Sequence, residues 1–166
     1  MRARNSRNFP KRLGQGVDLN VKALFFLTQA LWPLLKQSAS AAKPAKVINI
    51  GSIDGLRISP SETYSYQASK AAIHHLTRRM AARLIKDGIV VNGIVPGAFP
   101  SEMNRAARDH GDDYAGSIPA GRVGRPEDIA AAATYLASRA GDYVVGEMLT
   151  VDGGVVHACP PEMVGP

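Results

Sequence analysis

The sequence predicts an α/β fold built on a parallel sheet of about three strands with flanking helices. Short segments rich in valine and isoleucine, such as KPAKVINIGS (43–52), alternate along the chain with longer segments of helical apolar spacing. The strand-like segment GIVVNGIVPG (88–97) is apolar almost throughout, which is typical of a strand covered on both faces of a parallel sheet. This alternation favours right-handed crossovers between parallel strands.

The first helix is predicted over residues 17–39. Apolar residues recur at helical spacing from Val17 to Leu35, and Phe25 and Trp32 lie beside this row. The pattern indicates an apolar stripe along one side of the helix, ahead of the first strand.

A second helix is predicted over residues 61–88. It begins with a capping-box pattern from Ser61 to Tyr64, in which tyrosine replaces the usual Glu or Gln. It ends at Gly88, a residue that commonly follows the last helical turn. The strand 88–97 then follows directly.

The last third of the chain is expected to contain a loop, a helix and a strand. The loop 98–125 is rich in Gly, Pro and Asp, with a short helix near 102–109. The helix 125–139 has Pro126 at its start and acidic residues in its first turn, which suits the helix dipole. A final strand is predicted over 146–154.

Composition divides the chain into a basic tail (1–16), a partial domain (17–158) and a short C-terminal tail (159–166). The net charge is +6, and residues 1–12 contain five basic and no acidic residues, so the rest is nearly neutral. The only cysteine, Cys159, cannot form an internal disulfide, which favours a reducing compartment. The histidines and this cysteine lack metal-ligand spacing, so no metal is expected.

The sequence disfavours membrane and nucleic-acid functions, although some of its segments resemble the signals for them. No run of 18 apolar residues exists, so no membrane span is expected. The segment 23–35 after the basic start imitates a secretory signal, although Thr28, Gln29 and Pro33 interrupt it; an organelle transit peptide is a further alternative. The basic start could contact phosphates or acidic lipid, without specific nucleic-acid binding.

The segment YSYQASK (64–70) contains a candidate catalytic pair. Tyr66 and Lys70 are four residues apart, so on a helix they project from the same face. A lysine ammonium near a phenol favours the phenolate and makes the phenol a usable acid–base group. Tyr64 has Ala68, not a lysine, at the matching position. The alternative is a surface Tyr–Lys pair.

Other polar residues lie where such a pair could be completed. Ser52 follows the first strand, at the end where open α/β sheets bind ligands. Asn20 lies in a helix between apolar neighbours, although asparagine is a mediocre helix former. Pro96 and Gly97 end the second strand, and Ser101 follows shortly after.

Together these segments resemble the short-chain dehydrogenase/reductase family, from about Val17 to Gly154. The resemblance rests on six segments in the family's order: DLNVKALFF, NIGS, YQASK, VNGIVPG followed by Ser101, GRVGRPEDIA and TVDGG. It implies the C-terminal part of a Rossmann-like, doubly wound parallel sheet, and a cytoplasmic location. Within the family, the sequence is similar to 3-oxoacyl-(acyl-carrier-protein) reductases, including those linked to rhamnolipid synthesis.

The resemblance implies hydride transfer from NADPH, with NAD not excluded, to a ketone such as a 3-oxoacyl thioester. Tyr66 would donate the proton, Ser52 would hydrogen-bond the carbonyl oxygen, and Asn20 would position a water. Lys70 would hold the nicotinamide ribose and lower the pKa of the tyrosine. The loop 98–118 would be a mobile lid. Residues implied in cofactor binding are Tyr66, Lys70, Pro96, Gly97 and Ser101.

The sequence lacks the glycine-rich turn that such an enzyme uses to bind pyrophosphate. No G-x-G-x-x-G or T-G-x-x-x-G-x-G occurs, and Leu19 stands where a third glycine would follow Gly14 and Gly16. Two to three βαβ units' worth of chain is therefore expected to be missing. The sheet would keep an open edge and a helix an open apolar face. We expect a truncated reductase that is weak or inactive alone.

Two alternatives to an enzyme remain. In the family, helices matching 17–39 and 64–87 commonly form the subunit interface, so the chain could form homo-oligomers or, without catalysis, bind a full-length relative. A basic-tailed binder would instead lose binding when 1–12 is deleted. His74 and His75 are expected at the surface or at a subunit interface.

Overall fold

The computed structural model describes residues 14–59, 61–102 and 104–158 of the chain. The expectations for the basic start, and for Cys159 and the C-terminal tail 159–166, fall outside the described residues. The domain boundaries proposed from the sequence remain predictions.

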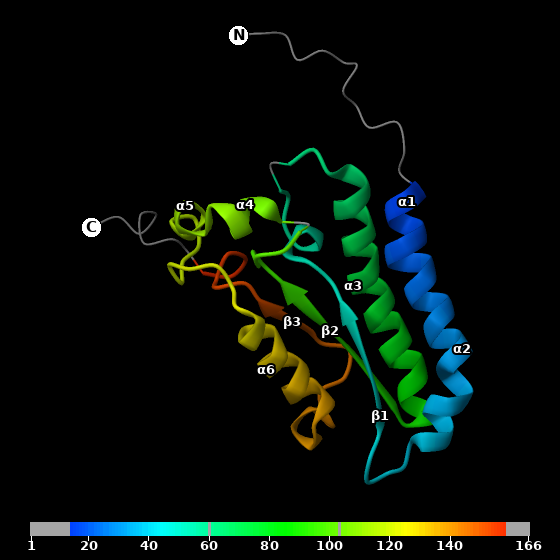
Figure 1. Ribbon diagram of the computed structural model, residues 1–166. Helices are drawn as coiled ribbons and strands as arrows, with labels where there is room; N and C mark the ends of the chain where they lie inside the picture. The colour runs from blue at the N-terminus through cyan, green and yellow to red at the C-terminus, as the bar shows by residue number, and fades with distance from the viewer. Residues whose placement is uncertain (1–13, 60, 103, 159–166) are drawn as a thin grey trace.

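A parallel sheet of three strands lies at the centre of the fold (Figure 1). Its strands are β1 (Ala45–Ile50), β2 (Ile89–Pro96) and β3 (Met148–Val151), in the order β1-β2-β3. Every β2 residue except Pro96 is buried, because β2 has a neighbour on each edge and helices on both faces. The predicted α/β class and parallel sheet are confirmed.

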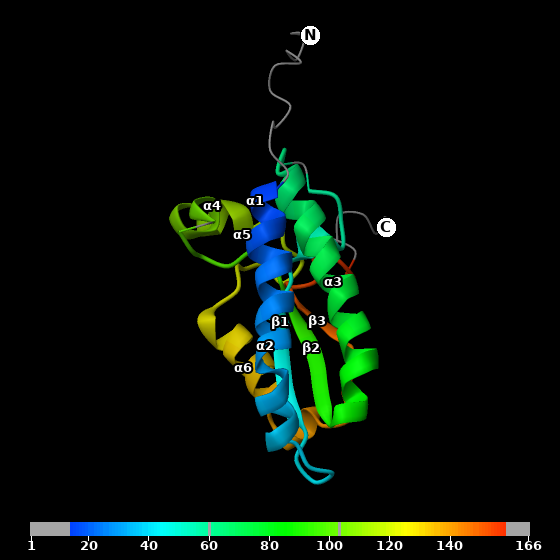
Figure 2. The ribbon, with the colours of Figure 1, turned by 90° about the vertical axis from the view of Figure 1, so that its right-hand side faces the viewer.

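One face of the sheet is covered by two long helical segments (Figures 1 and 2). The first runs through α1 (Gly14–Val17), a π-helical turn (Asp18–Lys22) and α2 (Ala23–Ser38). The second is α3 (Tyr64–Leu84). Their apolar sides meet the sheet in a cluster that includes Leu24, Trp32, Val47, Met80, Ile89 and Val91.

The opposite face is covered by α6 (Pro126–Ala137). Alternate residues of a strand point to opposite faces, so Ile94 faces α6 whereas Val91 faces α3. Leu136 is fully buried against Ile94, with Ile48 and Leu149 beside it. The sheet is therefore covered on both faces, as the apolar composition of β2 predicted.

The start of α3 differs from the predicted capping box. The helix begins at Tyr64 after Thr63, and the Thr63 side chain makes no capping bond. Instead, the Gln67 side chain donates to the Ser61 carbonyl oxygen at 2.9 Å, from within the helix. Tyrosine cannot replace the Glu or Gln of a capping box, because the box needs a carboxyl or amide oxygen. At the other end, α3 stops at Leu84, earlier than predicted, and a 3-10 turn (Ile85–Asp87) continues to Gly88, whose φ is +72°.

The segment between β2 and α6 contains two short helices where the sequence predicted one. These are α4 (Arg105–Asp109) and α5 (Gly111–Ala115). The Asn104 side chain accepts a hydrogen bond from the Ala107 N–H at 3.2 Å and so supports the first turn of α4. The glycine and the two aspartates that begin α5 read as a loop by composition alone.

The start of α6 should be sensitive to acid through Asp128. The Arg122 side chain and the Arg125 backbone N–H lower the pKa of Asp128 from 3.8 to about 2. A carboxyl whose pKa is lower in the folded state contributes stability above its unfolded pKa and loses it as pH falls. We expect Asp128→Asn to lower the melting temperature near neutral pH, and the gap to wild type to close between about pH 4 and pH 2. Thermal unfolding by circular dichroism across this range would check it; a constant gap would contradict it.

The described residues include an open sheet edge and an exposed apolar helix face, as the sequence predicted. β1 forms one edge of the sheet, and its last residue, Ile50, is 48% exposed. The outer side of α2 exposes a row of apolar side chains, Leu27, Leu31 and Leu34, at 61%, 40% and 63%. These surfaces correspond to the open edge and the open helix face expected from the sequence.

No helix within the described residues is long and apolar enough to cross a membrane. The same part of the chain contains no cluster of three potential metal ligands.

Candidate active site

The Tyr66–Lys70 pair lies on α3 beside the carboxyl end of β1. Lys70 Nζ lies 5.6 Å from the centre of the Tyr66 ring, within the range of a cation–π contact. The same ammonium donates a hydrogen bond to the Ile50 backbone oxygen at 2.9 Å. Lys70 is buried, and this burial lowers its pKa from 10.5. The pair is therefore brought together and fixed to the sheet, rather than lying free on the surface.

Ser52 lies two residues beyond Ile50, in the turn that follows β1. It precedes a short 3-10 turn (Ile53–Gly55), and its Oγ accepts a hydrogen bond from the Asp54 N–H at 3.2 Å. The Ser52 side chain is almost entirely buried. Because the Ser52 hydroxyl accepts in this bond, its own O–H can donate to another oxygen.

The turn that contains Ser52 packs directly on the backbone of α3. A Cβ added at Gly55 would lie 2.7 Å from the Lys70 carbonyl carbon and 2.8 Å from the Ala71 nitrogen. Such distances are too short for any side chain larger than hydrogen. Glycine at 55 therefore lets Ser52 and the Tyr66–Lys70 turn approach each other.

His74 corrects the prediction of a surface histidine. It is 3% exposed, and its Nε2 accepts a hydrogen bond from the Ser52 backbone N–H at 3.4 Å. Residues 66, 70 and 74 share one face of α3 because each is four residues after the last. This spacing was visible in the sequence and could have indicated that His74 faces the end of β1. His75 is exposed, as predicted.

Asn20 lies in the π-helical turn and contacts α3 through Ser69. Its Nδ2 donates to Ser69 Oγ at 2.9 Å, and Ser69 Oγ in turn donates to the Tyr66 carbonyl oxygen at 2.8 Å. Asn20 is therefore connected to the Tyr66–Lys70 turn through Ser69. Single π turns inside helices are frequent at functional sites.

The remaining predicted residues lie at the end of β2 and in the segment that follows it. Gly97 donates its N–H to the Val151 oxygen at 2.9 Å, and a Cβ there would lie 2.7 Å from Asp152 Cα. Pro96 precedes it, at the same carboxyl edge of the sheet as Ser52. Ser101 lies farther along on the surface, where its Oγ accepts from the Asn104 N–H at 3.0 Å. The structure thus groups Pro96 and Gly97 at this edge and leaves Ser101 outside it.

The donors at this edge fit one end of a dinucleotide cofactor. An ammonium has three N–H donors, and Ile50 accepts one from Lys70, so two remain for ribose hydroxyls. The glycine-rich turn that binds pyrophosphate has no counterpart in this sequence. The residues present therefore fit the nicotinamide and ribose end of such a group.

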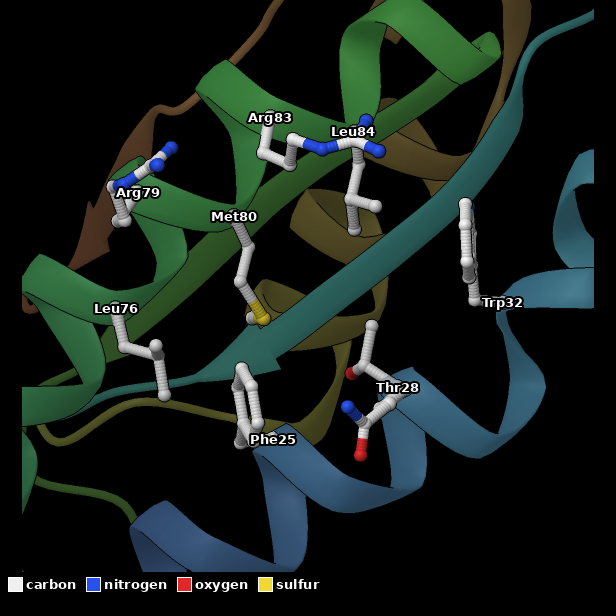
Figure 3. Close-up of a pocket in the computed structure, with 9 residues that line it drawn as sticks. Phe25, Thr28, Trp32, Leu76, Arg79, Met80, Arg83 and Leu84 are labelled. Carbon is white, nitrogen blue, oxygen red and sulfur yellow. The ribbon is translucent and has the colours of Figure 1, made fainter.

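A separate groove of about 350 Å³ opens between α2 and α3. Figure 3 shows Phe25, Thr28 and Trp32 on α2 facing Leu76 and Met80 on α3. None of the predicted catalytic residues lines it. The groove is a feature of the helical face and not of the carboxyl edge of the sheet.

Comparison with known proteins identifies related sequences and structures. The chain is 46% identical over 141 residues to the rhamnolipids biosynthesis 3-oxoacyl-[acyl-carrier-protein] reductase of Pseudomonas aeruginosa, covering 83% of this chain and 55% of that protein. The solved structure of a Pseudomonas aeruginosa RhlG/NADP active-site complex is 44% identical, with a TM-score of 0.82, covering 87% of this chain and 59% of that one.

A 3-ketoacyl-(acyl-carrier-protein) reductase from Brucella melitensis complexed with NADH is 27% identical, with a TM-score of 0.81, covering 92% of this chain and 62% of that one. The chain spans about half the length of the curated relatives it matches. A family model described as enoyl-(acyl carrier protein) reductase matches residues 10–156. By this match and these identities, the chain belongs to the short-chain dehydrogenase/reductase family.

Proposed function

We propose that this chain carries the catalytic part of an NAD(P)H-dependent ketone reductase. One observation supports this above the others: the Lys70 ammonium lies between the Tyr66 ring and the Ile50 carbonyl oxygen, two residues before Ser52. An acid, its charged neighbour and a hydroxyl donor therefore share the carboxyl end of β1. Ligands of open α/β sheets bind at this end.

The residues act on the oxygen of the substrate ketone. The Tyr66 phenol gives its proton to this oxygen as the carbonyl carbon gains a hydride, so the product is an alcohol and the tyrosine becomes a phenolate. The Ser52 O–H donates a hydrogen bond to the same oxygen and stabilises the developing negative charge. The Lys70 ammonium stabilises the phenolate, and Asn20 contributes through Ser69 to the position of Tyr66. The bound cofactor supplies the hydride.

NADP is the proposed cofactor, with NAD as the alternative. Of the two similar structures described above, the Pseudomonas aeruginosa one is a complex with NADP and the Brucella melitensis one a complex with NADH. Lys70 would hold the nicotinamide ribose, and Tyr66, Pro96 and Gly97 would complete the proposed contacts. Ser101 lies outside this edge of the sheet and is left out of them. Because the sequence has no glycine-rich turn for the pyrophosphate, we expect weak cofactor binding and slow turnover by the chain alone.

The proposed substrate is a ketone, with a 3-oxoacyl thioester as the first choice. This choice rests on the curated Pseudomonas aeruginosa relative described above, which is named as a 3-oxoacyl-[acyl-carrier-protein] reductase. The segment 98–118, which follows β2 and contains α4 and α5, is the proposed lid.

The proposed function is tested by titrating the purified chain with NADPH and with NADH while following cofactor fluorescence. Turnover is measured as 3-hydroxyacyl thioester formed from a 3-oxoacyl thioester, detected by mass spectrometry. We expect saturable but weak binding and slow product formation. A folded chain that neither binds either cofactor nor forms product would refute the proposed activity for this chain.

Association with a related subunit is a second candidate function, supported by the apolar side of α2. Leu27, Leu31 and Leu34 form an exposed row at helical spacing, next to the groove between α2 and α3. Apolar patches of this kind mark interaction sites in soluble proteins. The proposed partner is a second copy of the chain or a full-length relative.

The double substitution Leu27→Lys and Leu34→Lys should weaken this association. Two charges in the apolar row would have to be desolvated in an interface, so we expect a shift toward monomer in light scattering at fixed protein concentration. Ile58→Lys is the matched control, because Ile58 is 92% exposed and lies outside the helices. If both variants assemble like wild type, the α2 row is not the interface.

A further inference from the structure

His74 is a buried titratable residue that the proposed mechanism does not use. Its Nε2 accepts from the Ser52 backbone N–H at 3.4 Å, and its Nδ1 has no hydrogen-bond partner among the described residues. A buried polar atom without a partner is unfavourable, and an apolar side chain of similar size would avoid it. Stability therefore does not account for a histidine at this position.

The imidazole ring occupies the space between α3 and the turn after β1. A Cβ added at Gly51 would overlap the ring, and one at Gly55 would lie 2.8 Å from its Cε1 atom. The two glycines that flank the Ser52 turn thus leave room for this ring. His74 fixes the distance between the turn and the helix as well as the direction of the Ser52 N–H.

The bond to Ser52 requires the neutral ring with its proton on Nδ1, because only an unprotonated Nε2 can accept. Burial is the main cause of a lowered His74 pKa, and the nearby Arg78 and Lys70 charges add to it. The surroundings therefore favour the protonation state that the bond needs.

We propose that His74 is a positioning residue that holds Ser52 through its backbone N–H and so directs the Ser52 hydroxyl toward the substrate oxygen. The inference rests on the proposed function, in which Ser52 donates to that oxygen. In this proposal His74 acts through the Ser52 backbone N–H and not on the substrate directly.

Two substitutions separate the hydrogen bond from the space that the ring fills. His74→Gln keeps an acceptor oxygen near the position of Nε2, whereas His74→Leu keeps a similar volume without an acceptor. We expect His74→Leu to lower kcat about tenfold, on the order of one hydrogen bond, with the cofactor KM unchanged. His74→Gln should restore most of kcat. His75→Leu, at the exposed neighbour, should leave kcat and KM unchanged.

Nuclear magnetic resonance of the wild-type chain tests the bond without relying on turnover. Nitrogen-15 spectra should show the Nδ1–H tautomer of His74, and exchange of the Ser52 amide hydrogen should be faster in His74→Leu than in wild type or His74→Gln. An Nε2–H tautomer, equal exchange in all variants, or equal kcat in the Leu and Gln variants would overturn the proposal. Absence of turnover in wild type would instead count against the proposed function, and the spectra would still decide whether His74 holds Ser52.

Discussion

Replacing Tyr66 with phenylalanine is expected to lower the rate of ketone reduction by about 10²- to 10⁴-fold, the usual contribution of a positioned acid. The substitution removes only the phenol oxygen and leaves the ring, with Lys70 Nζ 5.6 Å from its centre. Packing and the Lys70–Ile50 hydrogen bond should therefore persist. The measurement is the initial rate of 3-hydroxyacyl product formation, with the cofactor Kd measured in parallel.

The matched control is Tyr64→Phe, two residues earlier on α3. Tyr64 is 41% exposed, and the position four residues later is Ala68, not a lysine. We expect its rate to stay close to that of wild type. If Tyr66→Phe retained the wild-type rate with a normal circular dichroism spectrum, the proton would have to come from another group and the proposed mechanism would be wrong.

Replacing Gly55 with alanine is expected to lower the free energy of unfolding by about 1–3 kcal/mol, the usual cost of overpacking a close contact. The new Cβ would meet the Lys70 carbonyl carbon at 2.7 Å and the Ala71 nitrogen at 2.8 Å. Both atoms belong to the backbone of a long helix, so neither can rotate away as a flexible side chain would. Urea unfolding followed by circular dichroism gives the free energy directly.

Gly116→Ala provides the comparison for this substitution. The nearest atom to a Cβ at Gly116 is the Asp113 oxygen at 3.9 Å, an ordinary van der Waals contact, so little change is expected. Gly55→Ala should also slow turnover, because the turn that carries Ser52 would move away from Lys70. Equal stability of the two variants would show that the turn can shift without cost.

The periodicity of the sequence was sufficient to predict the sheet and its main helices. Valine- and isoleucine-rich segments became β1 and β2, and the apolar spacing from Val17 to Leu35 became the helical segment that ends in α2. These predictions succeed because each depends on burial along a single segment. The start of α3 was predicted three residues early. The Gln67 side chain donates a hydrogen bond to the Ser61 carbonyl oxygen, and this contact between the helix and the preceding loop cannot be predicted from the local pattern.

The candidate site was predictable in its residue types but not in its connections. Tyr66 and Lys70 meet because of helix geometry alone. The Ile50 carbonyl that accepts from Lys70, the burial of His74 and the Asn20–Ser69 bond depend on packing between separate elements. Nothing in the local sequence around Asn20 marks its π turn. The features of the site that could not be predicted therefore depend mostly on contacts between segments far apart in the chain.

The atom that accepts the Lys70 hydrogen bond is the backbone oxygen of Ile50, so this bond does not depend on which side chain is present at position 50. No side-chain substitution at position 50 can delete the carbonyl oxygen, and the Ile50 side chain itself is 48% exposed. The position of the ammonium is instead fixed by the pairing of Ile50 with Ile94 across the sheet. Sliding β1 by one residue would turn that carbonyl away from α3. The position of the Lys70 ammonium therefore depends on the register of the strands, and substitution of the exposed side chain at position 50 should leave it unchanged.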